Sequence, residues 1–308
     1  MRNRTKLGTY HEIFMSIVSK TRIPISTIAK QMGRTGRGQR RATVSKYLSQ
    51  MYEQKISLQP NLILKTFEYP KRIAYFCKKK SKSKIASTFM ELRHDKRINY
   101  VLFISGLSDF FLTSRDENLD LKRYDLEIVE KSVLYTPIFT IPQGWCLSFE
   151  DAVKTLLNLD FKKGMLPRET EGALDWSDLD TRIFELMREN ARRPFTEVAG
   201  ETDKYSSTIK DHFYQFVLPQ CEIAHYFFPK GYDCYMQNLF RIYTHYEKSL
   251  VKALEKLPCT TYVYPLEKGL VFIIFHENIN IVMTFVEKME ENGILDKHLL
   301  FTPLRHYK

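Results

Sequence analysis

The amino-acid sequence repeats itself once, and this repeat is the feature that most constrains the fold. The pair Ile-Phe at 13–14 recurs at 183–184, and this offset of 170 residues continues without a gap from Pro24 to Pro194. Further along, Tyr-Val at 100–101 recurs at 262–263. Each match is short, but their common order along two halves predicts the duplication of a unit of roughly 140 residues.

Each half is expected to begin with helices and to continue with strands. A chain of 308 residues, 44% of them hydrophobic, is long enough for two or more domains with separate cores. In the first half the apolar spacing predicts helices over 10–20 and within 26–55, and a strand-like segment over 55–69. The order that follows is βαββαβ, the ferredoxin-like arrangement: strand 72–77, helix 81–94, strands 99–105 and 109–113, helix 119–131 and strand 133–141.

The predicted fold class is therefore α+β, with two winged helix-turn-helix units and two βαββαβ units of effector type. An exposed, polar stretch at 167–173 marks the boundary between the halves. The expected domains are a first winged helix-turn-helix over 1–60, a first βαββαβ domain over 61–142, a linker with one helix over 143–173, a second, degenerate helix-turn-helix over 174–220 and a second βαββαβ domain over 221–308.

The two predicted helix-turn-helix copies carry opposite charge. Residues 26–55 hold seven basic residues and one acidic residue, a net charge of +6, within a chain whose net charge is +11. Residues 196–220 hold two lysines and four acidic residues, a net charge of −2. Because affinity for DNA depends heavily on neutralising phosphates, the first copy is expected to be the main DNA reader. The alternative is a solvated basic loop between two core helices.

The turn of the first copy contains five additional residues, and they fall in an arginine- and glycine-rich loop. A helix-turn-helix presents its second helix to the major groove, so Arg40 and Arg41 are predicted to face base edges there. Arg34 and Arg37 lie in the turn, where contacts to phosphate are expected. The predicted double-stranded DNA-binding residues are Arg34, Arg37, Gln39, Arg40, Arg41, Thr43 and Lys46.

Three segments resemble a known family of transcription regulators. Residues 174–199 resemble the opening of the Lrp/AsnC, or feast/famine, regulators, with their Leu-Asp followed by Asp-x-x-Ile-x-x-x-Leu, and residues 206–213 are similar to their recognition helix. Residues 105–112 resemble the Gly-x-x-Asp turn of their effector domain. The resemblance implies sequence-specific transcription regulation, a homodimer, and an amino acid or other small-molecule effector near Gly106 and Asp109.

No other motif in the sequence points to catalysis or to metal binding. The five cysteines include no C-x-x-C pair, the eight histidines form no H-x-x-x-H pair, and no P-loop follows a strand. The sequence therefore predicts no cofactor, no metal and no enzymatic activity. No apolar run reaches the roughly 18 residues of a membrane span, and the expected location is the cytoplasm.

Two alternatives to DNA regulation remain open. Siroheme decarboxylases resemble the same fold and use a cavity of the effector-like domain for chemistry on a tetrapyrrole; histidines and arginines would line it. A module that binds a partner protein through its sheets is the other alternative. The arginine-rich loop favours DNA over both.

Overall fold

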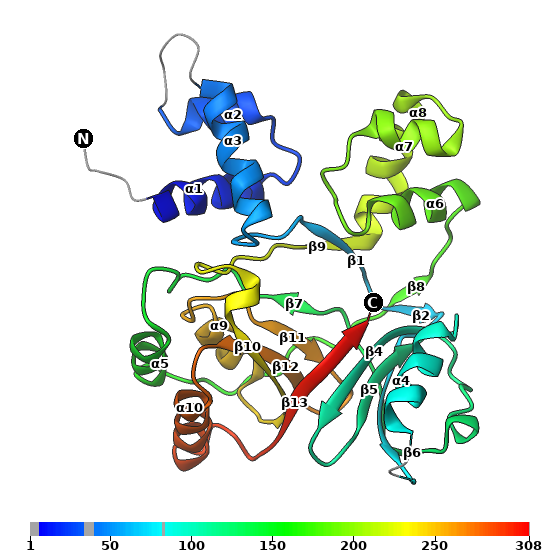
Figure 1. The fold of residues 1–308 in the computed structure, drawn as a ribbon, viewed down its shortest axis with the longest axis vertical. Helices are drawn as coiled ribbons and strands as arrows, with labels where there is room; N and C mark the ends of the chain where they lie inside the picture. The colour runs from blue at the N-terminus through cyan, green and yellow to red at the C-terminus, as the bar shows by residue number, and fades with distance from the viewer. Residues whose placement is uncertain (1–5, 34–39, 82–83, 308) are drawn as a thin grey trace.

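The structure, a computed structural model, describes residues 6–33, 40–81 and 84–307. It is a mixed α/β molecule in which two separate helical units stand over one body built from a large sheet (Figure 1). In the part of the chain that the structure describes, no helix is long and apolar enough to cross a membrane.

The first helical unit packs three helices around a small apolar core. The helices are α1 (Lys6–Ser19), α2 (Ile25–Gln31) and α3 (Arg40–Glu53). Ile13, Ile28 and Val44 are fully buried where these helices meet. Pro24 directly precedes α2, where its fixed φ suits the chain entering a helix.

The second helical unit repeats this arrangement. Its helices are α6 (Asp178–Met187), α7 (Phe195–Thr202) and α8 (Ser206–His212), and helical turns continue from α8 to Gln220. Ser177 caps α6 in a capping box with Asp180, whose side chain also accepts from the Ser177 backbone N–H. Ile183, Val198 and Ile209 are fully buried in its core.

The strands that follow the helical units pair with the opposite half of the chain. β1 (Asn61–Leu64) is antiparallel to β9 (Cys221–Ala224), and β2 (Phe67–Tyr69) is parallel to β8 (Glu171–Ala173). A wing would fold back against its own helix-turn-helix. The strand-like segment expected over 55–69 instead forms part of two ribbons that cross-link the halves.

The main sheet has nine strands in the order β6-β3-β5-β4-β13-β10-β12-β11-β7. Within each half the fourth strand pairs with the first, the first with the third and the third with the second. The strands are β3 (Ile73–Lys79), β4 (Ile98–Ser105), β5 (Phe110–Ser114), β6 (Leu126–Val133), β7 (Ile138–Phe139), β10 (Met236–Tyr243), β11 (Tyr262–Pro265), β12 (Leu270–His276) and β13 (Lys297–Tyr307).

The last strands of each half cross to the sheet of the other half. β13 pairs with β10 through residues 297–301 and then with β4 through residues 302–307. In the first half, β6 pairs with β3, and β7 pairs with β11 of the second half. The two four-stranded sheets are thereby joined twice, and their inner faces share one apolar cluster that includes Phe76, Phe111, Leu239, Phe275 and Phe301.

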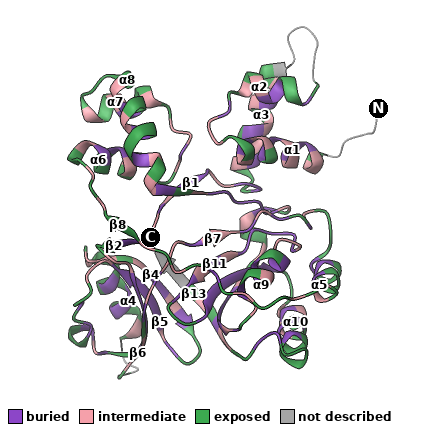
Figure 2. Cartoon of the chain, turned by 180° about the vertical axis from the view of Figure 1, so that it is seen from behind, coloured by how far each residue is buried: buried purple, intermediate pink, exposed green. Residues whose placement is uncertain are grey.

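Helices cover the outer faces of the two sheets. α4 (Ile85–His94) packs on the first sheet, and the apolar cluster on the outer face of the second includes side chains from α5 (Phe149–Leu157), α9 (Glu247–Leu254) and α10 (Ile279–Glu291). Burial follows this layering, with buried strands inside and exposed outer helix surfaces (Figure 2).

The helix predicted over 119–131 is wrong. The segment contains a single 3-10 turn at Lys122–Tyr124 and then β6. Residues 126–133 pair along the whole of β3, a long-range interaction that overrides the apolar spacing of Leu121, Leu126 and Val129. The strand expected over 133–141 is reduced to β7 for the same reason, since the preceding residues already belong to β6.

One buried ion pair ties the two halves together. The guanidinium of Arg241 on β10, only 1% exposed, donates to Glu130 on β6 through Nε at 3.0 Å and Nη2 at 2.7 Å. Its Nη1 also donates to the backbone oxygen of Ile242 at 3.1 Å. The carboxylate of the first half therefore compensates a charge that the second half buries.

Replacing Glu130 with Ala is expected to destabilise the fold by about 2–3 kcal/mol, because it leaves the Arg241 guanidinium buried without its counter-charge. Urea unfolding of the purified protein measures this. Glu127→Ala, an exposed glutamate on the same strand, is the matched control and is expected to change stability by less than about 0.5 kcal/mol. Equal losses in the two variants would contradict the role given to the pair.

Candidate functional site

A cavity of about 640 Å³ opens between the main sheet and the second helical unit, and we call it the central cavity. Its volume is in the range of about 300–1,000 Å³ typical of small-molecule and cofactor sites. Both halves of the chain line it. Its polar and aromatic lining includes Asn61, Arg72, Asn99, Tyr100, Phe111, Arg115, Phe139, Phe184, Arg188, Tyr226, Tyr232, Gln237, Tyr262 and Tyr264.

The roof of the central cavity is held by the turn that follows α6. The Leu62 N–H donates to the backbone oxygen of Arg188 at 2.9 Å, and the Ala191 N–H donates to that of Pro60 at 2.7 Å. These two bonds tie the turn to β1. They place Arg188 and Glu189 at the cavity while α6 continues away from it.

Arginines supply a positive charge that the protein does not neutralise. Burial lowers the pKa of Arg72 to about 10, and the nearby charge of Arg115 lowers it further. Burial, followed by the charge of Arg188, likewise lowers the pKa of Arg115. Arg72 donates to the backbone oxygen of Leu64 at 3.2 Å, but in the described part of the chain neither Arg72 nor Arg115 forms an ion pair with a carboxylate. Such a group of guanidiniums favours an anionic ligand, above all carboxylates, which they bind in a bidentate manner.

Tyrosines supply the aromatic walls. The ring centroids of Tyr226 and Tyr262 are 5.5 Å apart, and Phe139 lies 5.3 Å from Tyr226 and 5.1 Å from Tyr262. On the opposite strand Tyr100 contacts Phe111, with centroids 6.3 Å apart. Flat apolar walls of this kind suit a large planar ligand.

The phenol groups of the cavity are proton donors and not bases. Burial raises the pKa of four of them above the usual range, those of Tyr100, Tyr226, Tyr262 and Tyr264. At neutral pH these hydroxyls are therefore protonated. Among the described residues none of the four has a hydrogen-bond partner, whereas the hydroxyl of Tyr232 accepts from the Gln237 side chain at 2.9 Å. The four hydroxyls remain available to a ligand.

The central cavity holds no histidine, although histidines and arginines together were expected of an enzyme with this fold. His11 and His225 lie instead beneath the first helical unit, where burial lowers the pKa of each to about 4. His212 is held by Asp180, with Nδ1 2.7 Å from the carboxylate. No group of three metal-ligating side chains occurs among the described residues.

The residues predicted to bind DNA lie far along the first helical unit. Arg34, Arg37 and Gln39 fall outside the described residues, and Arg40 begins α3. On α3, Arg41 and Lys46 are exposed and Thr43 is half-buried. Of the described members of this set none lines the central cavity, so their role in DNA binding stays a prediction.

Gly106 and Asp109 lie in the turn between β4 and β5, close to the seam between the halves. Gly106 has φ +144°, and a Cβ there would lie 2.9 Å from the Phe301 ring. The Asp109 carboxylate accepts from the Lys79 backbone N–H at 2.8 Å and so caps the neighbouring strand. Neither residue lines the central cavity, and the effector site near them stays a prediction.

The sequence analysis did not single out the cavity arginines, but it held a signal for one pair of tyrosines. Tyr100 and Tyr262 are the corresponding residues of the Tyr-Val match between the halves. They lie on β4 and β11, the strands that receive the crossing segments, and both line the central cavity. Arg72 and Arg115 have no such counterpart, and only the tertiary structure brings them together.

Comparisons with known proteins identify a shared fold. No protein-family model matches the chain, and no curated protein matches it in sequence. The crystal structure of the siroheme decarboxylase NirDL aligns with 97% of this chain and 92% of its own, at a TM-score of 0.54 and 13% sequence identity. A structure of the same enzyme in co-complex with an iron-uroporphyrin III analogue aligns over the same shares, at 13% identity and a TM-score of 0.49.

The expectation that the chain is not an enzyme is contradicted, because the solved structure that shares its fold over nearly its whole length is that of an enzyme. The sequence argument treated helix-turn-helix elements as evidence for DNA regulation. The same elements here roof a cavity, and a fold does not by itself fix function. Membership of the Lrp/AsnC transcription regulators has neither a family match nor a curated relative behind it.

If the cavity arginines serve a ligand, they should reduce the stability of the empty protein. We expect Arg115→Met to raise the free energy of unfolding by about 1 kcal/mol, because it removes a desolvated charge that two other guanidiniums repel. Thermal and urea unfolding without ligand test this. A loss of stability similar to that of Glu130→Ala would show that Arg115 is a structural residue.

Proposed function

We propose that the chain is an enzyme of the siroheme-decarboxylase type that binds a tetrapyrrole carboxylate in the central cavity. The observation that carries the proposal is the group of uncompensated arginines facing aromatic walls in one cavity. Siroheme is a planar macrocycle edged with acetate and propionate carboxylates, so it needs cationic groups at its rim and flat apolar surfaces against its faces. The fold shared with a siroheme decarboxylase is consistent with this ligand class.

The arginines are assigned to binding and the tyrosines to proton transfer. A guanidinium that holds a carboxylate stabilises its charge and so opposes loss of CO₂ from that group. Arg72, Arg115 and Arg188 would therefore hold carboxylates that do not react, and the reacting acetate would lie among the tyrosines, where burial removes its water. This division uses binding energy from remote groups to place the reacting one.

The proposed reaction is decarboxylation of an acetate side chain to a methyl group. The bond between the methylene carbon and the carboxyl carbon breaks, CO₂ leaves, and the electron pair stays on the methylene carbon in conjugation with the macrocycle. A proton then completes the methyl group, and a cavity phenol such as Tyr262 is protonated and positioned to donate it. Water returns the proton to the phenol, so the step needs no oxidant or reductant.

We also propose that the chain arose by duplication of one helix-turn-helix plus βαββαβ unit, with domains over 1–60, 61–142, 174–220 and 221–308 joined by 143–173. Support comes from the strand order, which is the same in both halves, and from the β1–β9 pairing. The residues that pair, Ile63 with Glu222, are related by the offset of 159 residues that also relates the Tyr-Pro-Lys and Phe-Pro-Lys segments at 69–71 and 228–230.

Arg72→Gln and Arg115→Gln are each expected to weaken siroheme binding by about 10-fold or more, since each removes charge-assisted hydrogen bonds to a carboxylate. Titration of the purified protein into siroheme, followed by the Soret absorption band, measures the affinity. Mass spectrometry of the recovered macrocycle measures loss of CO₂.

The matched control is Arg182→Gln, an exposed arginine on α6 outside the central cavity, which should bind as the unsubstituted protein does. The proposal fails if the unsubstituted protein leaves the Soret band unchanged, or if Arg182→Gln weakens binding as much as Arg115→Gln does.

A second candidate function is DNA binding by the first helical unit, with a homodimer presenting two such units. The specific observation in its favour is that Arg41 and Lys46 are exposed on α3 in a unit of net charge +6. We expect Arg41→Ala to cost about 1–3 kcal/mol of DNA affinity, and Lys210→Ala in the acidic second unit to cost far less. Salt titrations on duplex DNA compare them, and equal losses would contradict the asymmetry between the units.

A further inference from the structure

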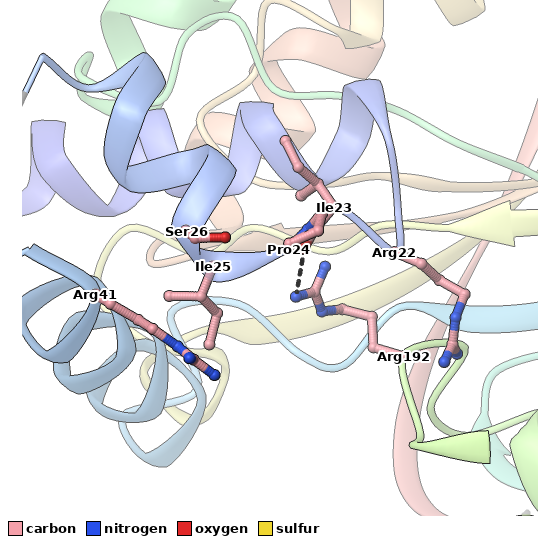
Figure 3. Close-up of a pocket in the computed structure, with 7 residues that line it drawn as sticks. All are labelled: Arg22, Ile23, Pro24, Ile25, Ser26, Arg41 and Arg192. Atoms are coloured by element: carbon pink, nitrogen blue, oxygen red, sulfur yellow. Dashed lines mark hydrogen bonds between the residues drawn. The ribbon is translucent and has the colours of Figure 1, made fainter. Parts of the chain in front are cut away.

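A second cavity lies at the junction of the two helical units, apart from the central cavity. This inter-unit cleft has a volume of about 370 Å³ and is lined by Arg22, Ile23, Pro24, Ile25, Ser26, Arg41 and Arg192 (Figure 3). Three of these seven residues are arginines, and none is acidic. They come from the loop before α2, from the first turn of α3 and from the loop before α7.

Two of the arginines form a reciprocal exchange between the helical units. Arg22 Nη1 donates to the backbone oxygens of Ala191 and Arg193, at 2.6 and 3.0 Å. Arg192 donates in return to the backbone oxygens of Thr21 and, at 3.2 Å, Ile23. Each donor and each acceptor has its counterpart at the offset of 170 residues. The exchange fixes both guanidiniums in place before any ligand arrives.

The charge of the inter-unit cleft is not neutralised by the protein. The charge of Arg192 lowers the pKa of Arg22, and burial lowers the pKa of both groups. No carboxylate is among the groups that shift either value; the partners are the phenols of Tyr214 and Tyr52. Arg41 is exposed and forms no ion pair with a described residue. Like charges held close together favour an anion that bridges them.

The corresponding position of the second helical unit shows what an unused cleft looks like. There Phe195 takes the place of Ile25, and its ring lies 3.9 Å from the guanidinium carbon of Arg22. The counterpart of Arg41, at the offset of 165 residues, is the neutral Ser206. The mirrored position is thus filled by an aromatic ring and lacks the third arginine, while the first side remains open and charged.

We propose that the inter-unit cleft binds a phosphate group, held by Arg41 and Arg192 with the Ser26 hydroxyl as a neutral donor. Arg41 extends from α3 toward Arg192, whose guanidinium is already oriented by its bonds to residues 21 and 23 (Figure 3). Arginine suits phosphate because its planar fork can donate two parallel hydrogen bonds. The phosphate can belong to a small molecule or to the backbone of a nucleic acid, since both present the same oxygens.

Isothermal titration calorimetry with two probes, pyrophosphate and a mixed-sequence DNA duplex, tests the proposal on the full chain. We expect at least one probe to bind and Arg41→Gln to weaken it by about 10-fold or more. Lys30→Gln, which removes an equal charge from an exposed position on α2 outside the cleft, should bind as the unsubstituted protein does. Arg41 is exposed, so its variant should fold normally, and thermal unfolding checks this.

The source of the phosphate follows from which probe binds with this pattern. Binding of pyrophosphate identifies a small-molecule site, and binding of the duplex alone identifies a contact to a nucleic-acid backbone. Arg72→Gln should leave either affinity unchanged, which separates the inter-unit cleft from the proposed tetrapyrrole site. The proposal is overturned if neither probe binds, or if Arg41→Gln and Lys30→Gln lose affinity equally.

Discussion

The exchange of strands between the halves is the constraint on which the rest of the structure depends. The end of β13 pairs with β4 of the first half, and β7 pairs with β11 of the second. β4 and β11 would otherwise be open sheet edges, and open edges are sites of uncontrolled pairing. Because both edges are taken by the opposite half, the inner faces of the two sheets must lie against each other. One shared apolar core and one central cavity result.

The treatment of buried charge differs between the core and the cavities. Arg241 has Glu130, and Arg168 pairs with Glu247, whose side chain is fully buried. Arg72 and Arg115 in the central cavity, and Arg22 and Arg192 in the inter-unit cleft, have no such partner among the described residues. A fold that neutralises its structural arginines but leaves these four uncompensated sacrifices stability at the cavities, which is the usual mark of binding sites.

The helical units serve the body of the molecule as well as presenting a basic surface. The turn after α6 roofs the central cavity through its bonds to β1, and the loop before α7 carries Arg192. The two cavities are therefore only a few residues apart along one segment, between Arg188 and Arg192. A helix-turn-helix used in this way is a structural element of a ligand site, whatever it contacts on its outer face.

The sequence by itself determined the local elements. The apolar spacing and Pro24 predicted the helices of the first unit, and the repeat predicted that a second unit would follow. It did not determine β6, because residues 126–133 have a helical spacing of leucine and valine and become a strand only by pairing with β3.

The sequence likewise carried Tyr100 and Tyr262 as a repeated pair without indicating what they face. Only the tertiary structure decided that Arg72, Arg115 and Arg188 meet in one cavity, since their proximity depends on the closure of the sheet and on the turn after α6. Local patterns follow from the spacing of side chains along one segment. A site assembled from both halves depends on long-range pairing, and no short window of sequence records it.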